Sequence, residues 1–145
     1  MRKSRRDLLR TSMVASGLVA FSGCSKLGNK GFTNEVEIKE IWLFNIDSNN
    51  TRVISVKLLD ENEVLLDERY DVEPKDGDVA GDEKIKQELP DSTGRFSIVS
   101  WLESYPGNKG RVNIYEETGA GCVTVNISIS EDRNYPAIFI HDGCN

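Results

Sequence analysis

Hydrophobic and polar residues alternate along short segments of this chain, and no segment keeps a convincing helical period. The clearest case is residues 122–130, where Val123, Val125, Ile127 and Ile129 alternate with polar residues. Such alternation is typical of a β-strand that is buried on one face. The same pattern predicts strands at 35–45, 52–59, 63–70, 94–102, 111–115 and 136–141, and a short one near 84–89.

Turn signals separate these segments at nearly regular spacing. Clusters such as Asp47–Asn50 and Tyr105–Asn108 are rich in Asn, Asp, Pro and Gly, which favour turns. Short strands with regular turns are typical of two packed sheets. We therefore predict an all-β domain over residues 35–145, an antiparallel β-sandwich of about seven strands, in which residues 71–92 form a long acidic connection.

The first predicted strand is apolar on both parities. Trp42 and Phe44 continue the parity of Ile38, whereas Ile41 and Leu43 occupy the other one. A strand that is apolar on both parities is expected to be covered on both faces. Trp42 is accordingly expected in the core.

Residues 1–23 have the organisation of an export signal. Five basic residues precede a weakly apolar segment, residues 11–21, which is too short to span a bilayer because a span needs about 20 residues. The Arg5-Arg6 pair, followed by Asp-Leu-Leu, resembles the twin-arginine export consensus. The small residues before Cys24 resemble a lipobox, with Phe21 where leucine is usual.

The resemblance implies a cleaved twin-arginine lipoprotein signal peptide over residues 1–23 and a two-chain lipid on Cys24. Residues 24–34, polar and glycine-bearing, would then be a flexible tether that holds the domain on the extracytoplasmic face of the cell membrane. The competing interpretations are a secreted chain that is cut elsewhere and a cytosolic chain with a basic N-terminus.

The charge balance narrows the classes of partner. The signal peptide holds five of the 18 basic residues and one of the 24 acidic residues, which leaves 13 basic and 23 acidic residues and a net charge of −10 beyond it. So acidic a surface argues against nucleic acid and against flat adsorption to anionic lipid. A protein partner at the cell surface is consistent with it.

Two cysteines remain once lipidation takes Cys24. Cys122 and Cys144 are an even pair, and disulfides persist outside the cytoplasm, so we expect them to be bonded. The alternative is a zinc site made of His141, Asp142 and the two reduced thiolates. A blue-copper site is excluded by inventory, because the chain has one histidine and no methionine beyond the signal peptide.

A resemblance in fold rests on two stretches. Residues 43–47 followed by residues 51–56 look like the start of small immunoglobulin-like or cupredoxin-like domains, and residues 94–96 (Gly-Arg-Phe) resemble a strand of such domains in haloarchaeal lipoproteins. The acid excess agrees with that source. The resemblance implies no assigned reaction.

Other candidate chemistry is sparse. The acidic residues between Asp76 and Glu83 lack the spacing of a calcium loop and are expected to be solvated, although weak cation binding is the alternative. Asn49 is a candidate N-glycosylation acceptor in a predicted turn, whereas the mid-strand match at Asn126 is taken as chance. Trp101 and Tyr105 are the better candidates for an exposed aromatic contact.

We expect no catalytic residues, no metal and no cofactor, since neither a nucleophile arrangement nor a glycine-rich phosphate loop is present. The first functional hypothesis is a non-enzymatic, membrane-anchored binding module that makes its contacts through loops at one end of the sandwich. The alternatives are a metal- or small-ligand-carrying lipoprotein and an accessory subunit of an exported enzyme or transporter.

Overall fold

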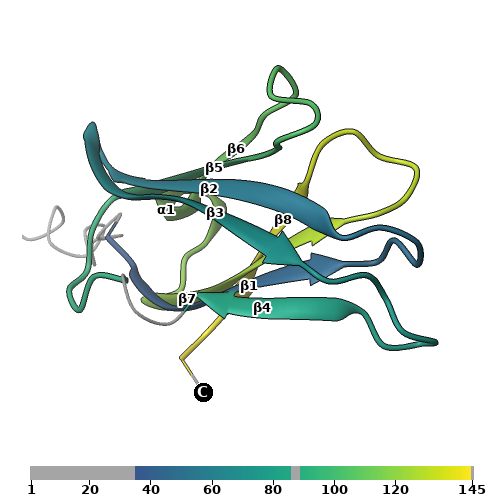
Figure 1. Ribbon diagram of the computed structural model, residues 1–145. Helices are drawn as coiled ribbons and strands as arrows, with labels where there is room; N and C mark the ends of the chain where they lie inside the picture. The colour runs from purple at the N-terminus through teal and green to yellow at the C-terminus, as the bar shows by residue number, and fades with distance from the viewer. Residues whose placement is uncertain (1–34, 86–88, 145) are drawn as a thin grey trace, which may run out of the picture. The chain divides into compact units, whose positions relative to one another are not determined.

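The computed structural model describes residues 35–85 and 89–144. The predictions on the signal peptide, Arg5, Arg6, Cys24 and the tether lie outside the described residues. The strands are β1 (Glu37–Asn45), β2 (Arg52–Asp60), β3 (Glu63–Val72), β4 (Gly81–Ile85), β5 (Phe96–Leu102), β6 (Gly110–Asn113), β7 (Cys122–Ile129) and β8 (Ala137–Asp142), and the one-turn helix α1 is Ile114–Glu117 (Figure 1). Within this part of the chain, no helix is long and apolar enough to cross a membrane.

The strands form two sheets of four, β4-β1-β7-β8 and β3-β2-β5-β6, so the all-β prediction is confirmed. Every neighbouring pair is antiparallel except β1 and β7, which run parallel. The prediction of a wholly antiparallel sandwich is therefore wrong at this pair. A parallel pair needs a long crossover, and here the crossover contains the whole of the other sheet together with β4.

The core lies between the two sheets. Ile54, Val56 and Leu58 of β2 are fully buried, as their shared parity predicts, and they face Val125 and Ile127 of β7 in the same cluster. Helix α1 replaces the end of the strand that was predicted to reach residue 115. Its first residue is a fully buried isoleucine, so the turn of helix caps one end of the core.

The expectation that the end of β1 is covered on both faces is wrong. Its pairing with β7 skips Lys39, which forms a β-bulge between Ile38 and Glu40. A bulge adds one residue and so reverses the parity that follows it. Ile38 and Ile41 consequently both point into the core, while Trp42 lies half-buried on the outer face of the sheet.

The acidic connection also differs from its prediction. Strand β4 begins at Gly81 and pairs with β1, so it starts three residues earlier than expected. At Gly81 a Cβ atom would lie 1.8 Å from the carbonyl oxygen of Glu73, and only glycine permits that approach of two backbones. Asp82 and Glu83 thus belong to a strand, whereas Asp76 lies in a turn closed by a bridge to Val79.

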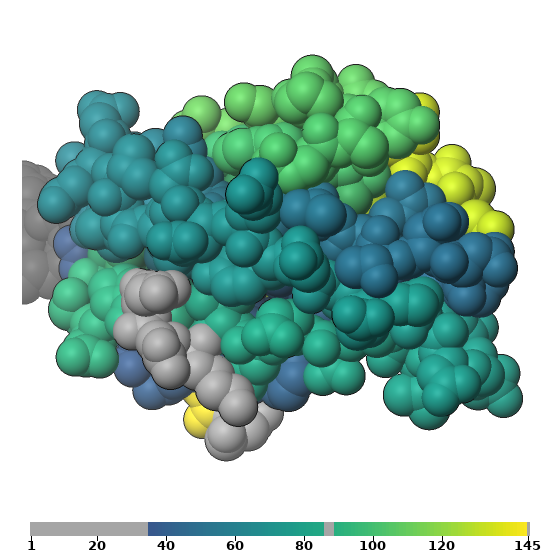
Figure 2. All heavy atoms as spheres, viewed as in Figure 1, coloured from purple at the N-terminus to yellow at the C-terminus, as the bar shows by residue number. Residues whose placement is uncertain are grey.

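The four connections that follow odd-numbered strands meet at one end of the sandwich, because β1, β3, β5 and β7 run the same way (Figure 1). We call this end, residues 46–51, 73–80, 103–109 and 130–136, the loop end. Figure 2 shows the β3–β4 connection as a lobe that projects from it. The described chain begins and finishes at the opposite end, where β1 starts and β8 stops.

Candidate functional site

The loop end collects exposed apolar side chains, one from each of its four connections. Ile46 is 45% exposed, Val79 70%, Tyr105 43% and Tyr135 50%. Among the described residues, the only other exposed large hydrophobic side chains are Val64 and Phe139. Around the four lie serine, asparagine, aspartate and glycine residues, a composition that in binding loops combines adaptable hydrogen bonding with rigid aromatic contacts.

Asp47 holds the first of these connections in place from beneath. Its side chain is fully buried and accepts hydrogen bonds from the backbone N–H groups of Asn49 (2.8 Å) and Asn50 (3.2 Å). Its Oδ2 lies 2.6 Å from Nη2 of Arg52. The backbone N–H of Asn49, with help from the Asn50 amide and the Arg52 guanidinium, lowers the pKa of Asp47 to about 2 against the desolvation that would raise it.

Asn45 extends this network to the other sheet. Its Nδ2 donates to the carbonyl oxygens of Asn50 (2.9 Å) and Val72 (3.0 Å), and its Oδ1 accepts from the N–H of Asp47 (2.9 Å). The N–H of Lys75 donates to the Asp47 carbonyl at 2.8 Å. The network therefore joins the β1–β2 and β3–β4 connections into one rigid base.

The burial of Asn45 and Asp47 was not predicted from the sequence. Residues 47–50 were recognised only as a turn. The signal that could have found them is Asn45 itself, a polar residue on the buried parity of β1 that had to find partners. An aspartate two positions later, ahead of Ser-Asn-Asn, is the arrangement of an Asx-turn.

The β7–β8 connection is tied to the same base. Nδ2 of Asn49 donates to Oε1 of Glu131 at 3.0 Å. The predicted glycosylation acceptor is therefore exposed, but its amide nitrogen is already hydrogen-bonded to a neighbouring connection. A glycan at Asn49 would have to displace that hydrogen bond. The guanidinium of Arg133 lies 6.0 Å from the centre of the Tyr135 ring, within reach of a cation–π contact.

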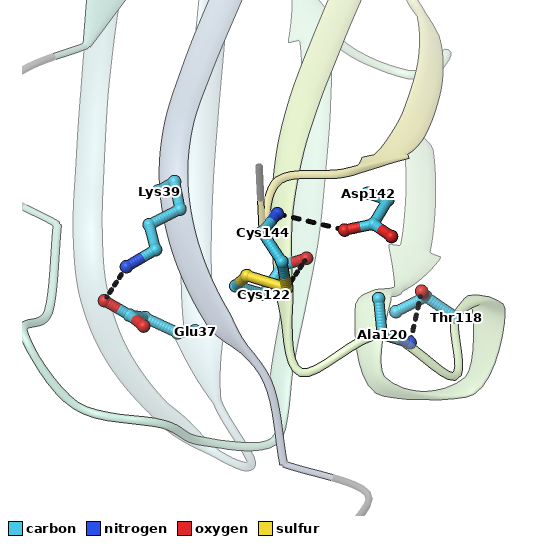
Figure 3. The surroundings of a disulfide bond; sticks show 7 residues. All are labelled: Glu37, Lys39, Thr118, Ala120, Cys122, Asp142 and Cys144. Carbon is cyan, nitrogen blue, oxygen red and sulfur yellow. Dashed lines mark hydrogen bonds and ion pairs between the residues drawn. A yellow bond between two sulfur atoms is a disulfide. The ribbon is translucent and has the colours of Figure 1, made fainter.

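The cysteine pair lies at the opposite end of the molecule. Cys122 opens β7, Cys144 follows β8, and the structure joins them in a disulfide with the Cα atoms 5.3 Å apart (Figure 3). The N–H of Cys144 donates to Oδ1 of Asp142 at 2.9 Å. The bond thus fastens the end of the edge strand β8 to the start of β7.

This arrangement bears on the metal alternatives. The ligand atoms of Cys122, Asp142 and Cys144 lie within 4.8 Å of one another, and His141 is not part of that group. Sulfurs bonded to each other are not thiolates, and thiolates are what zinc binds. In the described part of the chain, the acidic residues from Asp76 to Glu83 form no group that could surround a cation.

The two aromatic residues singled out by sequence behave differently. Tyr105 is exposed at the loop end, in a turn closed by the N–H of Asn108 on its carbonyl oxygen (3.0 Å). Trp101 is half-buried on the outer face of β5, with the Lys109 ammonium 4.5 Å from its ring centre. Only Tyr105 therefore belongs to the loop end.

No family of known proteins, no curated protein and no solved structure matches this chain.

Proposed function

We propose that this protein is a non-enzymatic binding module, held on the extracytoplasmic face of the cell membrane by lipid on Cys24, that contacts a protein partner through its loop end. The observation that carries the proposal is the exposure of Ile46, Val79, Tyr105 and Tyr135 on four neighbouring connections. Small apolar and tyrosine side chains on a rigid base form binding sites at low entropic cost.

The position of the loop end suits an anchored module. The tether would join the domain at Glu35, and β1 then runs for nine residues to the loop end. At about 3.3 Å per residue, that strand carries the contact surface about 30 Å from the attachment point. The loop end is then the end of the domain that lies farther from the tether, and a partner can approach it there.

The finer fold that we propose is immunoglobulin-like. The order β6-β5-β2-β3 corresponds to the G-F-C-C′ order of a variable-type sheet, and the antiparallel pairing of β1 with β4 corresponds to strands B and E. In such domains the B–C and F–G loops lie at the binding end. Their counterparts here, residues 46–51 and 103–109, both belong to the loop end.

The test is site-specific photo-crosslinking of the full chain in intact cells. A photoreactive residue replaces Tyr105 or Tyr135, and the matched control replaces Val64, which is 49% exposed at the other end of the sandwich. We expect the same adduct from both loop positions and none from the control. Equal labelling at Val64, or no adduct at either tyrosine, would refute the proposed contact surface.

The anchor is tested by Cys24→Ser. We expect the wild-type chain to partition with membranes and the variant to leave them, while both keep the same thermal unfolding midpoint. A Cys24→Ser chain that still fractionates with membranes would contradict the lipid anchor.

A further inference from the structure

The outer face of the β4-β1-β7-β8 sheet has an uncharged centre built from three strands. The register places Trp42 of β1 beside Asn126 of β7, and Asn126 beside Phe139 of β8. The rows on either side follow the same strands. We call the following set the aromatic face: Trp42, Phe44, Thr124, Asn126, Ser128, Phe139 and His141.

Two of its aromatic rings, Trp42 and Phe44, are held in position by their neighbours. Nε1 of Trp42 donates to Oε2 of Glu40 at 2.8 Å, and Lys84 from β4 both bonds to Glu40 and lies 5.1 Å from the centre of the Trp42 ring. The Phe44 ring is nearly parallel to that of Trp42, at 11°, with 6.1 Å between the centroids. Phe139 is 50% exposed. Fixed rings lose little freedom when a ligand binds.

Polar groups between the rings are open to a ligand. Within the part of the chain that the structure describes, the side chains of Thr124, Asn126 and Ser128 form no hydrogen bond. All three side chains are half-buried on the outer face of β7. An open hollow of about 650 Å³ continues the face toward the disulfide, lined among others by Glu40, Thr124 and Asp142.

The charges around this face select against an anionic ligand. Glu40 and Lys84 are paired with each other, and the carboxylates of Asp82, beside Phe44, and of Asp142 lie at its margins. An anionic group placed over the centre would lose hydration and would meet these carboxylates. Neutral hydroxyl groups, by contrast, match the free amide and hydroxyls in both donors and acceptors.

We infer that the aromatic face binds a neutral saccharide chain. The apolar C–H faces of sugar rings stack on Phe44 and Phe139, with Trp42 behind the Phe44 ring, while their hydroxyls hydrogen-bond with Asn126, Ser128 and Thr124. This site lies on a sheet face and not at the loop end, so it is independent of the proposed protein contact.

The experiment is native affinity electrophoresis of the purified full chain in detergent, in gels that contain a soluble neutral β-glucan, mannan or galactomannan, with anionic alginate as the charge control. Phe139→Ala and Asn126→Ala remove an exposed ring and a free amide. Trp101→Ala is the matched control on the outer face of the other sheet. Thermal unfolding of every variant shows that the fold is kept.

We expect at least one neutral polymer to retard the wild type. Each aromatic-face variant should weaken the retardation about tenfold, and Trp101→Ala should leave it unchanged. Retardation by none of the neutral polymers, by alginate alone, or equally in all variants would overturn the inference.

Two other occupants give distinct results. A dimer that dissociates on Phe139→Ala, seen by light scattering, would mean that a second copy covers the face. An intact mass with sugar on Asn126, the second sequon, would mean that the chain's own glycan covers it. Either result would overturn the inference and would leave the proposed function of the loop end standing.

Discussion

The outer faces of the two sheets are built from the same kind of alternating strand but carry different chemistry. On the β3-β2-β5-β6 sheet, Val99 and Trp101 are surrounded by Lys57, Arg69 and Arg111, with acidic residues beside them. On the β4-β1-β7-β8 sheet, the centre carries aromatic rings and neutral polar groups. Mixed charges on an outer face maintain solubility. On the second sheet such charges, those of Glu40, Lys84 and Asp82, lie beside the centre and not in it, so the centre is a surface that solubility alone does not require.

The two ends of the sandwich also differ in the interactions that hold them together. At the loop end the buried Asp47 network joins one sheet to the other, whereas at the opposite end the disulfide joins two strands of a single sheet. The Asp47 network should affect the stability of the whole sandwich, and the disulfide should mainly affect the β4-β1-β7-β8 sheet. Four changes test this comparison.

The largest effect is expected from deleting one residue in each sheet. Deleting Lys39 removes the extra residue of the bulge and leaves strict alternation in β1, so the free energy of unfolding should change by less than about 1 kcal/mol. Deleting Lys57, the matched lysine in β2, whose pairing with β5 has no bulge, turns buried side chains to solvent and should cost about 4 kcal/mol or prevent folding. Urea denaturation measures both. Equal losses in the two variants would show that Lys39 is not an inserted residue.

Removal of the disulfide comes next. In Cys122→Ser/Cys144→Ser the free energy of unfolding should fall by about 3 kcal/mol, because the bond closes a loop across a sequence separation of 22. Hydrogen exchange should rise in both sheets through the loss of global stability, and it should rise most in β7 and β8, whose ends the bond joins. The control is the wild type in reducing agent, which should match the double variant. Uniform loosening of both sheets would contradict the local role of the bond.

Asp47→Asn should lower the stability of the whole sandwich by about 2 kcal/mol at neutral pH. The pKa of Asp47 is about 2 in the fold and 3.8 without it, so its contribution is complete above the higher value. It is lost as the pH falls from about 4 to 2. The wild type should therefore converge with Asp47→Asn in acid, as followed by thermal unfolding. Ser48→Ala, at an exposed neighbour, should change neither stability nor its pH dependence.

The smallest effect belongs to Glu40→Gln, which acts on the aromatic face alone. The hydrogen bond from Lys84, then that from Trp42, lowers the pKa of Glu40. The carboxylate should therefore hold Trp42 at pH values above its ordinary pKa and release it as the pH falls below that range. In a Trp101→Phe background, Trp42 fluorescence should shift on acidification, and Glu40→Gln should show the acid spectrum at every pH. A spectrum that is insensitive to pH and to the substitution would mean that Glu40 does not position the ring.

The parts of the fold that follow from local pattern could be predicted. The alternation in β2, β5 and β7 gave the correct strands and buried faces, since Ile54, Phe96 and Val125 lie where their parity places them. Tyr105 was correctly singled out as an exposed aromatic. The disulfide partners followed from counting, because only two cysteines remain beyond Cys24.

The rest depended on contacts between residues distant in sequence. A bulge at Lys39 is defined only by the strand beside it, so the outward position of Trp42 could not be read from β1 alone. The burial of Asp47 depends on Asn50, Arg52 and the backbone of β3, and the aromatic face exists only because β7 and β8 lie next to β1. Alternation within a strand determines which side chains share a face, but only pairing between strands decides which faces meet the core and which rings meet one another.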